Sequence, residues 1–200
     1  MIHAFLVQCM CLWLMINCMT QLSSCEPEQT TLILGFGNPL CGDDGAGAKV
    51  IELLPKHQLP YNVSVMNAGL PGWSLPSWFE GWQTVILIDA MEMGEMPGTW
   101  RKIHLRPISE NIQAGDDPIK FKQKSEIFSI HQPDLANGLA LAEALDLLPS
   151  NLILYVIQPL TIEVGYSLSE AVQKSLPGLI ESILDDLGIV IYEPKKNFAS

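Results

Sequence analysis

The apolar residues follow strand-type patterns in some segments of the chain and helical spacing in others, which predicts strands interleaved with helices. Continuous apolar runs at 32–34 and 85–88, and the segment 151–157, which is apolar after Asn151, are typical of strands buried on both faces of a parallel sheet. Residues 62–66 and 99–105 instead alternate apolar and polar side chains. The first of these is expected as a second strand along the chain, and the other as an edge or antiparallel strand.

Apolar residues at helical spacing fill the intervals between these strands. We expect a helix that Asp43 or Asp44 caps and Pro55 ends. A short helix is expected at 76–82, and a further helix at 133–148 with Pro133 as its first residue. Residues 167–170, Ser-Leu-Ser-Glu, are similar to a capping box that opens a last helix, in which Pro177 would produce a kink. This order of elements favours an α/β fold.

The stretch from 31 to 54 predicts a strand, a tight glycine turn and a helix. Asp43 and Asp44 would then lie at the carboxyl end of a strand, the edge at which open α/β sheets bind ligands. Nucleotide binding is disfavoured, because the glycine spacing departs from G-x-G-x-x-G and two carboxylates would repel a phosphate. Helix capping needs only one carboxylate. The second indicates a metal ligand or a general base.

Two further residues occupy comparable positions. Asp89 directly follows the buried strand at 85–88, and His131 lies just outside the N-terminus of the predicted helix at 133–148. Each taken alone could be a turn aspartate or a histidine bound to backbone groups. Together with Asp44 they can converge at one edge of the sheet, where two carboxylates and one imidazole would suit a divalent transition metal. His104, which has no acidic neighbour in the sequence, is expected to be a solvated strand residue.

Four segments of the chain together resemble the hydrogenase maturation endopeptidases. They are GFGNPLCGDDGAG at 35–47, VILIDA at 85–90, SIHQPDL at 129–135 and IQPLTIEVGYSLSEAV at 157–172. The first is close to the family pattern G-x-G-N-x-L-x-x-D-[DE]-x-x-G, and the likeness extends from about 31 to 187. The resemblance implies a three-layer αβα sandwich with a mostly parallel, twisted central sheet and helices on both faces.

The same resemblance implies an activity. A protein of this family clips a C-terminal extension from the large-subunit precursor of a nickel-iron hydrogenase once nickel has been inserted. Asp44, Asp89 and His131 match the family's metal site, with Asp44 and Asp89 as the candidate catalytic carboxylates, while the substrate-binding residues stay unassigned. Nickel would be carried by the precursor, so the free enzyme is expected to be metal-free. A water attacking a metal-polarised carbonyl is one possible mechanism.

Other functions stay open at this level. A metal-dependent hydrolase of the same fold could act on another peptide, and a nickel-delivery protein could bind metal without cutting. Cys41 could be a nucleophile with His131 as its base, although the family pattern has no cysteine there and a small buried side chain is the default expectation.

Composition limits the classes of molecule that are expected to bind this chain. The chain has 200 residues and a net charge of −11, which disfavours nucleic acid and anionic membranes as partners. No repeat or change of composition divides residues 31–192, which are expected to form one domain, followed by a polar tail at 193–200. We expect a cytoplasmic monomer.

Residues 1–30 form a separate, apolar extension. They contain a run of signal-peptide length, and Leu22 to Cys25 resembles a lipoprotein cleavage box, but no positive charge precedes the run. Of the five cysteines, four lie in this segment. Translation from Met19 is the explanation we favour, with export as the alternative and a membrane span disfavoured by the shortness of the run.

Overall fold

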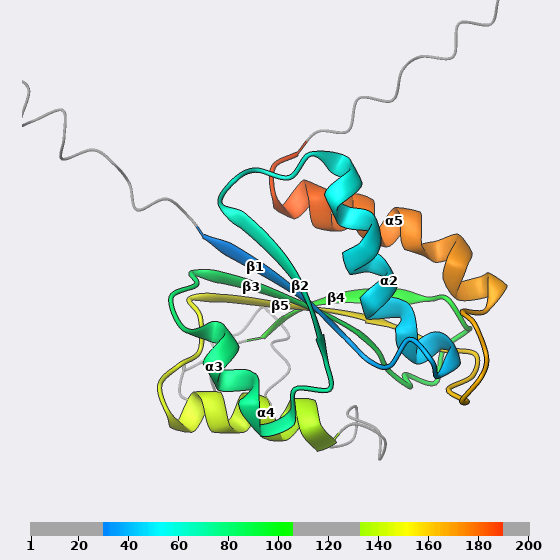
Figure 1. Ribbon diagram of the computed structural model, residues 1–200, viewed down its shortest axis with the longest axis horizontal. Helices are drawn as coiled ribbons and strands as arrows, with labels where there is room; N and C mark the ends of the chain where they lie inside the picture. Colours follow the sequence, from blue (N-terminus) through cyan, green and yellow to red (C-terminus); the bar gives the residue numbers. More distant parts are fainter. Residues whose placement is uncertain (1–29, 106–132, 190–200) are drawn as a thin grey trace, which may run out of the picture.

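The computed structural model describes residues 30–105 and 133–189, which form one sheet and its covering helices (Figure 1). The strands are β1 (Thr31–Phe36), β2 (Val63–Gly69), β3 (Thr84–Ala90), β4 (Trp100–Leu105) and β5 (Asn151–Ile157). The α-helices are α2 (Ala46–Leu53), α3 (Leu75–Phe79), α4 (Pro133–Ala144) and α5 (Glu170–Asp186). Short 3₁₀ turns are η2 (Gly42–Gly45), η3 (Leu54–His57) and η4 (Gly72–Ser74).

The sheet has the strand order β2-β1-β3-β5-β4 and is parallel except at one edge. β1 pairs in parallel with β2 and β3, and β3 pairs in parallel with β5. β4 pairs antiparallel with β5, as the alternating pattern at 99–105 predicted. Because the four parallel strands run the same way, their carboxyl ends meet at one edge of the sheet, hereafter the carboxyl edge.

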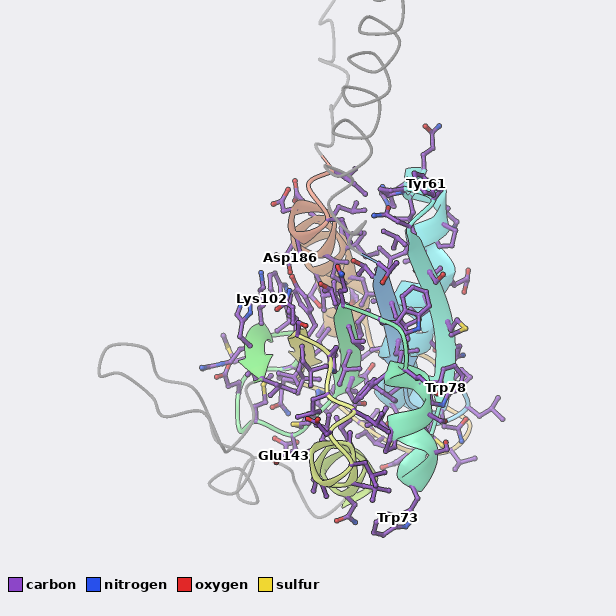
Figure 2. The ribbon with its side chains drawn as sticks, turned by 90° about the vertical axis from the view of Figure 1, so that its left-hand side faces the viewer. Tyr61, Trp73, Trp78, Lys102, Glu143 and Asp186 are labelled. Atoms are coloured by element: carbon purple, nitrogen blue, oxygen red, sulfur yellow. The ribbon has the colours of Figure 1, made fainter. Side chains whose placement is uncertain are left out.

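Helices cover both faces of the sheet, so the fold is the predicted αβα sandwich (Figures 1 and 2). Alternate strand residues such as Ile33, Ile86 and Ile153 pack with α2 and α5 on one face. Their neighbours, including Leu34 and Leu87, pack with α3 and α4 on the other. Both faces of the central strands are therefore buried, which explains their continuous apolar sequences.

Two glycines allow α2 to lie directly on the sheet. A Cβ added at Gly47 would fall 2.4 Å from the carbonyl oxygen of Phe36 and 2.6 Å from that of Ile88. At Gly35 in β1, an added Cβ would fall 2.4 Å from the carbonyl oxygen of Gly47. Such distances exclude any side chain, so these glycines set how closely the helix approaches the ends of β1 and β3.

Several helix ends differ from the predictions. α4 ends at Ala144, earlier than predicted, and the chain then turns at Asp146, which has a φ of 57°. α5 is capped by Ser169, whose Oγ accepts a hydrogen bond from the backbone N–H of Val172, so the cap lies two residues beyond the predicted Ser167. Pro177 lies inside α5. Pro55 does stop α2, but the chain continues into η3.

Some predictions fall outside the described residues. These are the extension before residue 30, the polar tail at 193–200 and His131. Over residues 30–105 and 133–189, none of the helices has the length and apolar character needed to cross a bilayer.

Candidate active site at the carboxyl edge

A glycine turn folds the chain back over the end of β1. Gly37 has a φ of 99°, and a Cβ there would lie 1.9 Å from the carbonyl oxygen of Asp44. Its backbone N–H donates to the carbonyl of Gly69 at the end of β2, at 2.9 Å. This turn therefore places η2, and with it the paired aspartates, directly above the carboxyl edge.

Asp44 folds back onto the turn and keeps one carboxylate oxygen unused. Its Oδ2 accepts a hydrogen bond from the backbone N–H of Asn38 at 2.6 Å, and Asn38 Oδ1 accepts one from the N–H of Leu40. The side chain is nearly buried, with 8% of the residue exposed. Among the described residues, Oδ1 of Asp44 makes no hydrogen bond, so it can still bind a cation or a proton.

Asp43 has a different role, and neither aspartate caps a helix as the sequence suggested. η2 has Cys41 at its N-cap position with no side-chain capping bond. Asp43 is fully buried, and its two oxygens accept backbone N–H groups from the segment after β5. Oδ2 accepts from Leu160 at 2.8 Å and Thr161 at 3.4 Å, and Oδ1 accepts from Ser169 at 2.6 Å. Both of its oxygens are thus occupied.

Asp89 is the penultimate residue of β3, the neighbouring strand at the same edge, and so lies inside the strand that it was expected to follow. In the register of β1 and β3, Gly35 lies opposite Ile88, so Asp89 is beside the last residue of β1. It is 1% exposed. Because Leu87 and Met91 face the α3 and α4 side, alternation directs Asp89 to that side too. η2 lies against β3, so Asp44 and Asp89 come to one edge as predicted.

Helix α4 starts at this edge on the side that Asp89 faces. It leads back to the start of β5, so it runs opposite to the parallel strands, and its N-terminal end lies at the carboxyl edge (Figure 1). Gly138 packs against the carbonyl of Gly72 in η4, which follows the end of β2. His131 lies outside the described residues, so its place in the site stays a prediction. Within 30–105 and 133–189, no three His, Cys, Asp or Glu residues form a group that could hold a metal.

Gln158 is a structural residue of the edge that sequence reasoning did not identify. It follows β5, is 3% exposed, and its Oε1 accepts the backbone N–H groups of Met93 at 2.6 Å and Glu95 at 3.3 Å. Its Nε2 donates to Glu92 Oε1 at 2.8 Å. Gln158 therefore fixes the loop that leaves Asp89. The available signal was a Gln-Pro pair directly after a buried strand.

The remaining candidates have simpler surroundings. His104 is exposed on β4, as predicted. Cys41 is a free thiol of intermediate exposure, not the fully buried side chain that was expected. Its pairing with His131 concerns a residue outside the described part of the chain, and so stays a prediction.

This geometry defines a class of protein: a doubly wound α/β protein with three buried carboxylates, those of Asp43, Asp44 and Asp89, at the carboxyl edge of its sheet. A family model described as hydrogenase maturation protease matches residues 48–186. The chain belongs to that family, and is thus a peptidase of the hydrogenase maturation type.

Characterised relatives agree with this assignment. The chain is 31% identical over 158 residues to the hydrogenase expression/formation protein HoxM of Azotobacter vinelandii, covering 78% of this chain and 71% of HoxM. It is 29% identical over 164 residues to HupD of Rhodobacter capsulatus, covering 81% of this chain and 72% of HupD.

Solved structures have the same fold. The [NiFe] hydrogenase maturation protease HybD of Thermococcus kodakarensis is 28% identical, with a TM-score of 0.60, covering 79% of this chain and 98% of HybD. The endopeptidase HybD of E. coli is 24% identical with a TM-score of 0.66, covering 80% of this chain and 92% of that protein, and supports the fold alone.

Proposed function

We propose that this protein is an endopeptidase that removes the C-terminal extension of a nickel-iron hydrogenase large-subunit precursor after nickel insertion. The observation that carries the proposal is the placement of Asp44 and Asp89 at the same carboxyl edge, where one oxygen of Asp44 accepts no hydrogen bond from the described residues. A buried carboxylate oxygen without a donor is costly unless a proton or a cation reaches it. The relatives HupD and HoxM are named hydrogenase expression/formation proteins, which supports a hydrogenase precursor as the substrate.

Recognition of the precursor would depend on nickel, which is part of the substrate. Asp44 and Asp89 would contact the nickel through oxygen, and His131 would add the nitrogen that suits a transition metal better than Mg²⁺. Asp43 would not contact the nickel, because backbone N–H donors occupy both of its oxygens. A protein with so few ligands needs the precursor to complete the coordination, so we expect the purified protein to hold no nickel.

Peptide hydrolysis would then depend on how the bound nickel positions the peptide beside the carboxylates. The precursor's nickel would hold the adjacent peptide at the carboxyl edge, where Asp44 or Asp89 could accept a proton from the attacking water. We expect the reaction to take place in the cytoplasm and the enzyme to act as a monomer.

The test mixes the purified protein with nickel-loaded and nickel-free precursor and follows the loss of the extension by mass spectrometry. Wild type should cut only the loaded form. Asp44→Asn should not cut, although it should fold normally, because the asparagine oxygen can still accept the N–H of Asn38. His131→Ala should also lose activity towards the loaded precursor.

Three outcomes would contradict the proposal. Equal cutting by wild type and Asp44→Asn would remove Asp44 from the site. Cleavage of the nickel-free precursor would favour a hydrolase whose substrate recognition does not depend on bound nickel. Binding of loaded precursor with transfer of nickel and no cleavage would favour a nickel-delivery protein.

A further inference from the structure

Five large apolar side chains are exposed beside the candidate active site. They lie on the turn after β1 and on the segment after β5, and we call them the edge patch: Leu40 (69% exposed), Leu160 (62%), Ile162 (43%), Val164 (80%) and Tyr166 (58%). Both segments leave strands at the carboxyl edge, so the patch borders the turn that carries Asp44.

Backbone hydrogen bonds tie the two segments of the edge patch together. Gly42 N–H donates to the carbonyl of Tyr166 at 3.0 Å, Asp43 N–H to that of Thr161 at 3.0 Å, and Gly165 N–H to that of Leu40 at 2.9 Å. The segment from 158 to 169 contains neither helix nor strand. Its conformation is therefore set by its attachment to the turn.

The carboxylate of Asp43 anchors the same segment from below. It is fully buried and accepts the N–H groups of Leu160, Thr161 and Ser169, which bracket the patch. Charge-assisted hydrogen bonds of this kind are stronger than neutral ones. The anchor holds the polar backbone inward, while the apolar side chains stay in water.

An ordered loop that exposes this much apolar surface is typical of a binding site. Scattered apolar residues need no explanation, but a contiguous patch indicates an interaction surface. Fixing the loop before binding also removes the entropy cost of ordering it in the complex. The patch adjoins the place where the substrate must lie, so the substrate is its natural partner.

We infer that the edge patch is the docking surface for an apolar segment of the precursor protein, next to the peptide that is cut, and that Asp43 is the residue that positions it. This inference rests on the proposed function. The partner segment should carry little negative charge, because the chain itself has a net charge of −11 and Glu163 is exposed within the patch.

The experiment compares Val164→Asp and Leu160→Asp with a matched control, Leu145→Asp. Leu145 is 54% exposed and follows the end of α4, at the opposite edge of the sheet. Binding of the nickel-loaded precursor is measured by biolayer interferometry, and KM and kcat are measured separately. A carboxylate placed in an apolar interface is disfavoured, so we expect each patch variant to weaken Kd and raise KM by about tenfold or more. Both kcat at saturation and the melting temperature should stay at the wild-type value.

The outcomes separate this inference from the proposed function. Wild type that binds the precursor without cutting it contradicts the activity alone, and the binding series still tests the patch. Patch variants that bind as tightly as Leu145→Asp overturn the inference, even if cleavage is normal. A dimer of the free enzyme in sedimentation that Val164→Asp dissociates, with unchanged Kd for precursor, would assign the patch to self-association and also overturn it.

Discussion

Two adjacent aspartates do unlike work because their surroundings supply different numbers of donors. Asp43 meets backbone N–H groups on both oxygens and acts as an internal anchor. Among the described residues, Asp44 accepts a hydrogen bond from one donor, Asn38 N–H, which leaves its second oxygen available for chemistry. From the sequence, one of the two was expected to cap the helix and the other to serve as a metal ligand or a general base. The structure therefore predicts different effects on stability for substitutions of Asp43 and Asp44.

Asp43→Asn should be strongly destabilising. An asparagine would turn one donor-accepting oxygen into an N–H₂ group that faces a backbone N–H, and that loss in a buried site costs about 2–4 kcal/mol of unfolding free energy. Loss of a helix cap would cost only about 0.5–2 kcal/mol. Urea unfolding of Asp43→Asn and Asp44→Asn decides between these roles. Equal stability of both variants would contradict the anchor.

At the scale of elements, the close contact between α2 and the sheet determines where the active-site turn lies. α2 begins directly after η2, so any outward movement of the helix would move Asp44 as well. The contact depends on Gly47, which meets backbone oxygens of both β1 and β3. Backbone atoms cannot rotate away as side chains can, so an added methyl group must displace the helix.

Gly47→Ala should therefore lower stability by about 2–3 kcal/mol, because it overpacks a rigid contact. Gly178→Ala is the matched control, since Gly178 also lies inside a helix and a Cβ there would meet only Trp100 Nε1, at 3.9 Å. Alanine is the better helix former, so this control should gain about 0.5–1 kcal/mol. Thermal unfolding of the pair measures the difference, and a neutral Gly47→Ala would show that the helix has room.

At the scale of the whole molecule, a polar cluster joins the last helix to the antiparallel edge of the sheet. Tyr155 is fully buried in β5; its hydroxyl is 3.0 Å from Ser182 Oγ and donates to Asp186 Oδ2 at 2.7 Å. Asp186 also forms an ion pair with Lys102 of β4, and both residues are labelled in Figure 2. Burial is the main cause that raises the pKa of Tyr155, and the neighbouring Asp186 raises this pKa further.

This shift predicts loss of stability in alkali. The folded state keeps the phenol protonated, whereas the unfolded chain releases the proton near its ordinary pKa of about 10. The contribution is complete below that pH and is lost as the pH rises towards the folded pKa. Urea unfolding between pH 8 and pH 11 should show this slope in wild type and a smaller slope in Tyr155→Phe. Tyr61→Phe, at an 84% exposed position, should match wild type.

Local pattern was enough to predict most of the fold. Strand periodicity located the five strands of the described residues, including the antiparallel one, because burial on one or both faces of a sheet determines which strand positions are apolar. It also placed Asp44 and Asp89 at one edge, since parallel strands end together. Helix ends were less accurate: Ser169 rather than Ser167 caps α5.

The sequence by itself determined the elements and the edge at which chemistry could occur, because these depend on spacing along the chain. Only the tertiary structure decided that Asp43 is the aspartate whose oxygens are occupied by backbone donors. These donors are the N–H groups of Leu160 and Ser169, which lie 117 and 126 residues away along the chain. The same holds for Gln158, whose partners Met93 and Glu95 lie more than 60 residues earlier. Hydrogen bonds that span such separations leave no periodic trace in the sequence, and only the folded chain brings their donors and acceptors together.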